Sequence, residues 1–230
     1  MVNQMIRIPE GCVLWLDLTE PTGNVVYDHS GHGNNGKVYG AVLEKRLQYI
    51  GRKFDGVDDK IDCGNDESLD ITEEMTIEVW FYYKGYTSYP RLVSKGHNSP
   101  WSVFFDDDNT IFVIVDNYEE GRHQVSITPN TWQYFAWRYY KEEGVNKAEY
   151  YINGESKLTL SGLPDIPSNP TQKVGIGDEI ETGFNRPFYG VITHVGLYNR
   201  ALHPSEIKHL YEEFQKRVFR RIDPLNIRMR

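Results

Sequence analysis

Short runs of alternating polar and apolar residues, separated by turn signals about every 8–12 residues, extend through most of the chain. In one run, Ile77, Val79 and Phe81 would fall on a single face of an extended strand. Asp55-Gly56 is a strong hairpin signal because this dipeptide accepts the backbone conformation of a tight turn. No long helical pattern interrupts the series, so the sequence predicts an all-β fold, arranged as a β-sandwich.

The C-terminal part has a different pattern. Ile207, Leu210 and Phe214 recur at helical spacing, and Ser205 is suited to the start of a helix. The sequence therefore predicts one short C-terminal helix over residues 205–217.

Composition narrows the classes of function. The 230 residues carry a formal net charge of −8, which argues against nucleic-acid binding because phosphate contacts need clustered Lys and Arg. Aromatic residues make up 13% of the chain, a content that suits strands and also sugar-binding surfaces. Residues 1–7 lack the apolar run of a signal peptide, and no stretch approaches the length of a membrane span. These features favour a virion or cytoplasmic protein without membrane insertion over a classically secreted one.

The two cysteines, Cys12 and Cys63, both lie in segments with strand character. A disulfide between them requires neighbouring strands, which the sequence does not specify, so both states stay open. Two buried free thiols are the favoured state, and two cysteines make no metal motif.

Six turn-and-strand segments occur in an order that resembles the laminin-G-like branch of the concanavalin A-like lectin/glucanase jelly rolls. The segments are Asp28-His29-Ser30-Gly31-His32-Gly33-Asn34-Asn35-Gly36, Phe54-Asp55-Gly56-Val57-Asp58-Asp59, Thr76-Ile77-Glu78-Val79-Trp80, Trp132-Gln133-Tyr134-Phe135-Ala136, Tyr151-Ile152-Asn153-Gly154 and Tyr198-Asn199-Arg200-Ala201-Leu202. The resemblance implies a jelly-roll β-sandwich of two antiparallel sheets over residues 11–214. It leaves an N-terminal arm over residues 1–10 and a tail over residues 215–230.

The tail is basic and unusually apolar for a solvated terminus, since it contains Val218, Phe219, Ile222, Leu225 and Ile227. Docking onto the parent domain is the first interpretation. Docking through residues 216–230 onto another subunit, in a homo-oligomer or a capsid, is the second.

Proteins with this type of fold include lectins, carbohydrate-binding modules, adhesins, virion proteins and glycan-cleaving enzymes. The family's glucanases carry three spaced carboxylates on one strand. Here Glu179 and Glu181 have the first spacing, but Gly183 breaks the strand and Phe184 occupies the position of the third, so the pair is interpreted as a solvated loop. A lyase-like set around Arg138 is likewise interpreted as packing or a non-catalytic groove.

The sequence therefore predicts a non-catalytic recognition or display module, which binds glycans or serves as a decoration protein or adhesin on a viral or phage surface. A glycoside hydrolase or polysaccharide lyase acting in the concave groove is one alternative. A pure assembly protein that docks through its tail is another.

Aromatic residues in expected loops, with polar companions, are the candidates for a ligand surface, because sugar binding combines ring stacking with a few fixed polar groups. The predicted ligand-binding residues are Tyr86, Tyr89, Arg91, His97, Trp101 and Tyr118.

The resemblance also implies a calcium site, because many family members join the Asp-x-Ser-Gly turn to an Asp on the penultimate strand through this ion. The corresponding ligands would be Asp28, Asn34 and Asn35. Thr193 stands where the family has the Asp. This replacement removes a formal charge and the strongest expected ligand, so the sequence favours loss of calcium over its retention.

Overall fold

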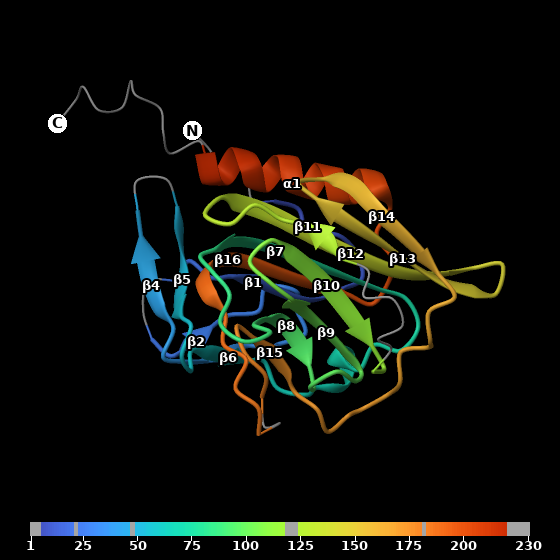
Figure 1. Ribbon diagram of the computed structural model, residues 1–230, viewed down its shortest axis with the longest axis horizontal. Helices are drawn as coiled ribbons and strands as arrows, with labels where there is room; N and C mark the ends of the chain where they lie inside the picture. Colours follow the sequence, from blue (N-terminus) through green and yellow to red (C-terminus); the bar gives the residue numbers. More distant parts are fainter. Residues whose placement is uncertain (1–5, 21–22, 47–48, 118–123, 181–182, 220–230) are drawn as a thin grey trace.

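The computed structural model describes residues 6–20, 23–46, 49–117, 124–180 and 183–219. Two eight-stranded antiparallel sheets pack face to face, and one helix covers the outside of the first sheet (Figure 1). The predicted all-β sandwich of two antiparallel sheets with a C-terminal helix is confirmed. Within the described part of the chain, the helices lack the length and apolar character needed to span a bilayer.

The first sheet, here the β7 sheet, has β7 near its centre. Its order is β14 (Glu155–Ser161), β13 (Val145–Ile152), β12 (Trp132–Glu142), β7 (Met75–Tyr83), β16 (Tyr189–Tyr198), β5 (Ile50–Asp55) and β4 (Val42–Lys45), with β1 (Cys12–Asp17) also paired to β16.

The second sheet, here the β8 sheet, lies beneath the β7 sheet in Figure 1. Its order is β11 (Val125–Ser126), β10 (Thr110–Val115), β9 (Trp101–Phe105), β8 (Arg91–Lys95), β15 (Val174–Ile176), β6 (Lys60–Asp62), β3 (Gly36–Tyr39) and β2 (Val25–Val26). A single 3₁₀ turn, η1 (Glu67–Leu69), follows β6 among the described residues.

The main apolar core fills the space between the sheets. Ile77, Val79 and Phe81 of β7 point into it, as their alternation predicts, and meet Val93 of β8 and Val103 of β9. Burial of such side chains is the main favourable contribution to the stability of the sandwich.

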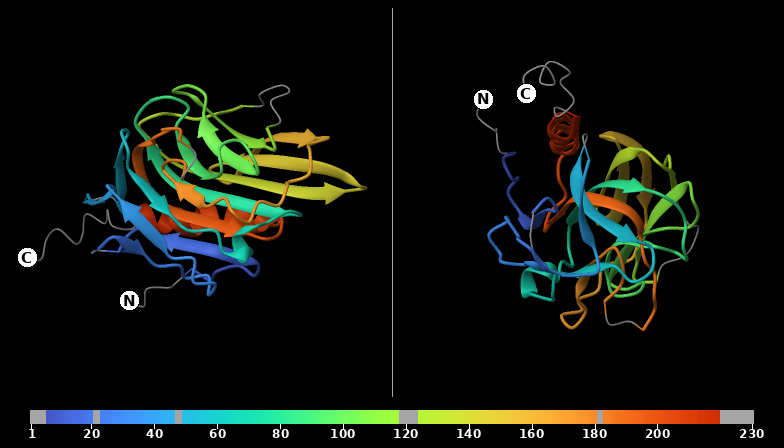
Figure 2. Two further views of the ribbon diagram at one scale, coloured as in Figure 1. Left: turned by 90° about the horizontal axis from the view of Figure 1, so that it is seen from below. Right: turned by 90° about the vertical axis from the view of Figure 1, so that its left-hand side faces the viewer.

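The opposite face of β7 is buried as well, because α1 (Pro204–Phe219) lies across it (Figure 1; Figure 2 shows the helix nearly end-on). Leu210 and Phe214 of the helix pack against Trp80 of β7 and Trp15 of β1. The helix continues beyond Phe214, so the first residues of the predicted tail are helical, whereas residues 220–230 lie outside the described residues.

A buried carboxylate lies between this sheet face and the helix. Glu78 of β7 is 0% exposed, and the Tyr134 hydroxyl donates to its Oε2 at 2.6 Å while the Tyr198 hydroxyl donates to its Oε1. His194 of β16 places Nε2 at 3.4 Å from the same Oε1 and Nδ1 at 3.6 Å from Oδ1 of Asp17. The two strands that flank β7 thus supply the polar groups that a buried carboxylate requires.

The imidazole of His194 is enclosed by rings. Its centroid lies 4.1 Å from that of Phe214 and 4.4 Å from that of Trp15. Burial lowers the pKa of His194, but hydrogen bonding and charge from Asp17 and Glu78 outweigh burial, so the pKa is raised above 6.5.

Cys12 and Cys63 are free and buried, which confirms the favoured thiol state. Burial is the largest cause that raises the pKa of both thiols, and it leaves them protonated and poorly reactive.

Folding raises the pKa of His194, so the folded state favours the protonated imidazole. The resulting stabilisation of the fold is complete below the ordinary pKa of 6.5 and is lost as the pH rises through the raised pKa. We expect the urea concentration at the unfolding midpoint to decrease as the pH rises above about 6.5. His194→Gln, which does not titrate, should flatten this dependence. An equal slope in both proteins would contradict the assignment.

Gly196 of β16 faces the Glu78 carboxylate, and a Cβ atom at Gly196 would lie 2.7 Å from Glu78 Oε1. Gly196→Ala should therefore lower the free energy of unfolding by about 1–3 kcal/mol, as overpacking does. Gly85→Ala is the matched control, because the nearest atom to its added Cβ would be 3.8 Å away. Chemical denaturation of both variants measures the difference, and equal midpoints would show that β16 accommodates the methyl group.

Candidate functional site

The outer face of the β8 sheet lies on the side of the molecule away from α1 (Figure 1). A small pocket lies on this face. The volume of this hollow, here the Arg91 pocket, is about 220 Å³. Its lining residues are Tyr89, Arg91, His97, Asn98, Phe104, Ile114 and Arg186.

Two segments that are distant in sequence build the pocket, the stretch from Tyr89 to Ile114 and the connection between β15 and β16. Strands β8, β9 and β10 contribute Arg91, Phe104 and Ile114 to the face that points away from the main core. The turn between β8 and β9 contributes His97, and the connection between β15 and β16 contributes Arg186. The connection is held over the sheet by Asp178, whose Oδ1 accepts hydrogen bonds from the backbone N–H groups of Glu179 and Arg186.

A buried ion pair forms the base of the pocket. Arg91 is 2% exposed, and its Nε donates to Oε1 of Glu179 at 2.7 Å. Nδ1 of His97 lies 2.7 Å from the same oxygen. Burial lowers the pKa of Arg91, against the opposing effect of the Glu179 charge.

The burial of Glu179 overturns the sequence interpretation of a solvated loop carboxylate, since this side chain is 0% exposed. The reason is tertiary: the connection after β15 folds back over β8 and brings Glu179 against Arg91. Glu181 lies outside the described residues.

Rings and guanidinium groups alternate around the pocket wall. The Arg91 guanidinium carbon lies 4.0 Å from the centroid of Phe104, and that of Arg186 lies 5.2 Å from the centroid of Tyr89. The contacts of Arg91 and Arg186 with these rings hold the two guanidinium groups in place by cation–π attraction. His97 stacks on Phe184, with centroids 4.2 Å apart.

Tyr89 has a φ of 48°, in the left-handed region that is unusual for an aromatic residue.

Two donors in the pocket residues lack an acceptor among the described residues. The Arg91 Nη2 donates to the His97 carbonyl at 3.1 Å and to Asn98 Oδ1 at 3.0 Å, but its Nη1 has no partner. Nη1 of Arg186 donates to the Ser88 carbonyl at 3.3 Å, whereas its buried Nε has no partner. Buried donors are normally paired, so the protein itself leaves these two donors unsatisfied.

The structure places some of the predicted ligand-binding residues in one pocket and others outside it. It brings Tyr89, Arg91 and His97 together in the Arg91 pocket. Tyr86 is 37% exposed and contacts the edge of Tyr89, outside the lining. Tyr118 lies outside the described residues.

The expectation that Trp101 is an exposed loop aromatic is wrong. It is the first residue of β9 and points into the core between the sheets, with 0% exposure. Sequence reasoning missed Phe104, Ile114 and Arg186. The sole signal for Phe104 was that β9 is apolar at successive positions, which marks a strand covered on both faces.

Asp28 accepts four hydrogen bonds from its own surroundings. Its Oδ1 accepts from the N–H groups of Trp15 and Ser30, both at 2.9 Å, and its Oδ2 accepts from the Ser30 hydroxyl and the Asn34 N–H. Asn35 Oδ1 in turn accepts from the Asp28 N–H at 2.9 Å. These bonds fasten the turn to β1.

The other residues of the predicted calcium site also have protein partners. The Asn34 amide donates to the Val13 carbonyl and to Ser68, and the Thr193 hydroxyl donates to the Ile50 carbonyl at 2.7 Å. Whether calcium binds at Asp28, Asn34 and Asn35 stays a prediction.

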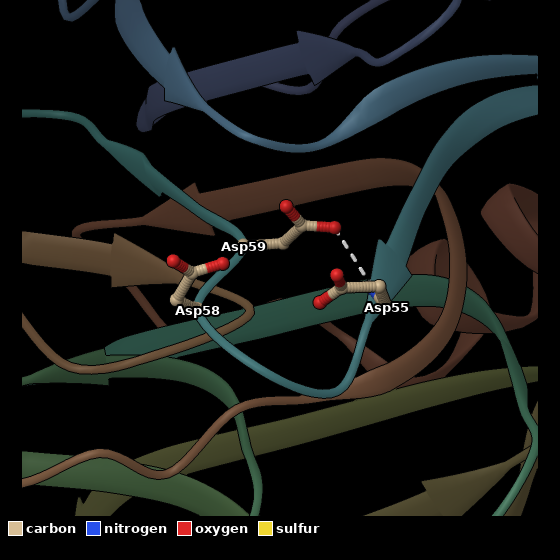
Figure 3. Close-up of side chains that lie close together, drawn as sticks. All are labelled: Asp55, Asp58 and Asp59. Carbon is tan, nitrogen blue, oxygen red and sulfur yellow. Dashed lines mark hydrogen bonds between the residues drawn. The ribbon is translucent and has the colours of Figure 1, made fainter.

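A second acidic group lies in the hairpin turn between β5 and β6. The carboxylate oxygens of Asp55, Asp58 and Asp59 lie within 4.8 Å of one another (Figure 3). Asp59 Oδ2 accepts from the Asp55 N–H at 2.8 Å, and burial raises the pKa of Asp59. Asp55 Oδ1 also accepts from the Val57 N–H at 2.8 Å, so hydrogen bonds within the protein brace this turn.

A larger open groove of about 850 Å³ lies on the β7 sheet. This Trp132 groove is lined by Glu44, Lys45, Arg46, Tyr49, Tyr82, Lys84 and Trp132. The rings of Tyr49 and Trp132 pack edge to face, with centroids 4.7 Å apart. Part of each ring surface therefore contacts the other ring and does not face the groove.

The predicted lyase-like set serves packing. Arg138 Nε donates to Glu149 at 2.9 Å, and its Nη1 donates to the Leu202 carbonyl, which ties β12 to β13 and to the segment before α1. Gln133 is buried and donates to the Thr128 carbonyl.

A family model described as the concanavalin A-like lectin/glucanases superfamily matches residues 55–208. Among curated proteins, none matches the sequence. Solved structures share the fold at low identity. The binding domain of Paraclostridial Mosquitocidal Protein 1 matches with a TM-score of 0.66 and 16% identity, over 89% of this chain and 52% of that one.

Two carbohydrate-active enzymes also contain similar domains. Domain 4 of AbnA, a GH43 extracellular arabinanase from Geobacillus stearothermophilus solved with arabinotriose, matches with a TM-score of 0.63 and 16% identity, over 87% of this chain and 98% of that one. A mutant Trypanosoma rangeli sialidase matches with a TM-score of 0.69 and 16% identity, over 91% of this chain. The chain spans about half of the mosquitocidal binding domain and 34% of the sialidase.

Glu179→Gln would leave the buried Arg91 guanidinium without its opposite charge. We expect a loss of about 3–5 kcal/mol in the free energy of unfolding, as when one partner of a buried ion pair is removed. Glu155→Gln is the control, because its partner Lys157 is exposed and surface pairs stabilise little. Urea denaturation measures both. Similar midpoints would show that the Arg91–Glu179 pair does not stabilise the fold.

Proposed function

The chain belongs to the concanavalin A-like lectin/glucanase superfamily, and from this premise we propose that it is a non-catalytic glycan-binding module whose binding site is the Arg91 pocket. The observation that carries the proposal is the convergence of aromatic rings and fixed hydrogen-bond donors at one hollow on a rigid sheet. Sugar recognition uses the same combination, in which rings pack against the sugar and a few polar groups fix its hydroxyls.

The polar groups of the pocket are arranged for binding. Arg91 and Arg186 are held by ion pairing, hydrogen bonds and ring contacts before any ligand arrives. Preorganised groups lose little conformational entropy on binding, so their hydrogen bonds contribute more of their strength to affinity.

Glycoside hydrolysis requires two carboxyl groups facing each other across a cleft, about 5–10 Å apart. Of the described residues, those that line the Arg91 pocket include no carboxylate. Glu179 lies beneath the lining and is engaged by Arg91 and His97. This arrangement supports a binding role over a hydrolytic one.

Two of the similar structures support the proposal of a binding role. One is titled a binding domain, and another is an arabinanase domain solved with arabinotriose. The viral or phage display role and assembly through residues 216–230 have no such support and stay predictions from the sequence.

A glycan array tests the proposal. We expect saturable binding to one glycan class and loss of that binding in Tyr89→Asn, because Asn tolerates the left-handed backbone of this position while removing the ring. Tyr27→Asn is the control, since Tyr27 is a 56% exposed tyrosine outside the pocket lining.

The array should be run with calcium and again with a chelator. Because the Asp28 oxygens already accept protein hydrogen bonds, we expect equal binding in both conditions. Absence of binding in both, or binding that Tyr89→Asn leaves intact, would refute glycan recognition at the Arg91 pocket.

A further inference from the structure

The Arg91 pocket contains more hydrogen-bond donors than acceptors. Arg91 Nη1 and Arg186 Nε have no partner among the described residues, and Arg91 is 2% exposed, so water reaches its guanidinium poorly. A buried donor without an acceptor destabilises the protein, and a ligand that supplies an acceptor removes that cost.

The acceptor oxygens of His97, Asn98 and Glu179 at the pocket are already engaged by Arg91. Asn98 Oδ1 and the His97 carbonyl both accept from Arg91 Nη2. Glu179 Oε1 accepts from Arg91 Nε and contacts His97. A hydroxyl group of a ligand that needs to donate a proton would therefore compete with these bonds, whereas a ligand oxygen that accepts has free donors to meet.

The charges of the arginine and carboxylate groups at the pocket also favour a ligand that accepts hydrogen bonds. Two guanidinium groups line the pocket, and the adjacent buried Glu179 carboxylate balances one of them. A second buried carboxylate, Asp178, accepts from the backbone N–H groups of Glu179 and Arg186, so the Arg186 guanidinium has no carboxylate ion pair among the described residues. An incompletely balanced cation at a poorly hydrated site favours an anionic partner, and guanidinium groups bind carboxylates with directed hydrogen bonds.

The size of the pocket limits what enters. Its volume of about 220 Å³ lies below the range of about 300–1,000 Å³ that is typical of pockets for drug-sized ligands. It therefore suits one terminal ring or substituent of a larger molecule, with the remainder of the glycan lying outside over the β8 sheet.

We propose that the Arg91 pocket selects a sugar unit bearing a carboxylate, whose two oxygens accept from Nη1 of Arg91 and Nε of Arg186. This inference rests on the glycan-binding function proposed above and names its ligand class as acidic sugars. The chain as a whole is acidic, with a formal net charge of −8, so the pocket provides a local exception to a surface that repels anions.

Matched ligands test the role of the charge. Titration calorimetry would compare the methyl glycosides of glucuronic, galacturonic and N-acetylneuraminic acids with the methyl ester of each, which keeps the ring and removes the negative charge. We expect at least one acid to bind, its ester to bind about 10- to 100-fold more weakly, and added salt to narrow the difference.

Variants then locate the site. Arg186→Gln should reduce the affinity for the acid to that of the ester, and Arg186→Lys, which keeps the charge but lacks Nε, should lie between. Arg46→Gln is the control, because Arg46 is an exposed arginine of the separate Trp132 groove. Circular dichroism of each variant confirms that the fold is intact.

The outcomes distinguish the two proposals. Equal affinity for an acid, its ester and the neutral methyl galactoside, all weakened by Tyr89→Asn, would overturn acid selection and leave glycan binding in place. No binding of any acidic or neutral sugar would overturn both. Acid binding that Arg46→Gln abolishes and Arg186→Gln preserves would also overturn the inference, because it would place the site in the Trp132 groove.

Discussion

The buried carboxylate of Glu78 is the constraint around which the β7 sheet and its helix are arranged. A charge with 0% exposure persists only where hydrogen bonds and opposite charge replace water. Tyr134 of β12, together with Tyr198 and His194 of β16, supplies them from the two strands that flank β7. Because each partner must reach the same two oxygens, the polar cluster also fixes the register of the three strands, and α1 then seals it from solvent.

The Arg91 pocket on the opposite sheet has the same type of buried ionic contact but a different balance. Each Glu78 oxygen has at least one partner, so that cluster serves structure. At the pocket, Glu179 engages Arg91 and His97, yet donors on Arg91 and Arg186 are left over. Since native proteins pair nearly all buried polar groups, an unmatched donor that borders a hollow is a better sign of a ligand than burial or charge alone.

Strand alternation and helical spacing predicted the parts of the fold that depend on residues close together in sequence. Alternation placed Ile77 and Val79 in the core, and helical spacing placed Leu210 and Phe214 on the buried face of α1. The pattern around Glu179 was interpreted wrongly, because its burial depends on Arg91, a residue 88 positions away in sequence. No periodicity encodes such a contact.

Trp101 and Phe104 show the same limit within one strand. The sequence prediction placed Trp101 in a ligand-binding loop and gave Phe104 no role, because three successive apolar residues, Val103, Phe104 and Phe105, do not show which of them faces the core. Trp101 proved to point inward and Phe104 outward, beneath Arg91. The candidate site could therefore be predicted at the level of its segment, through Tyr89, Arg91 and His97, but its far wall came from the connection that carries Arg186.

The position of the helix explains why the proposed binding site lies on the β8 sheet. By covering the central part of the outer face of the β7 sheet, α1 commits Trp15, Trp80 and Tyr134 to packing. The outer face of the β8 sheet has no such helix among the described residues, and a loop connection crosses it instead. A connection of this kind covers the sheet incompletely, so side chains such as Arg91 can be held rigidly from below while still bordering a hollow. Rigid support and incomplete cover are the two conditions for a preorganised binding site, and the outer face of the β8 sheet meets both at the Arg91 pocket.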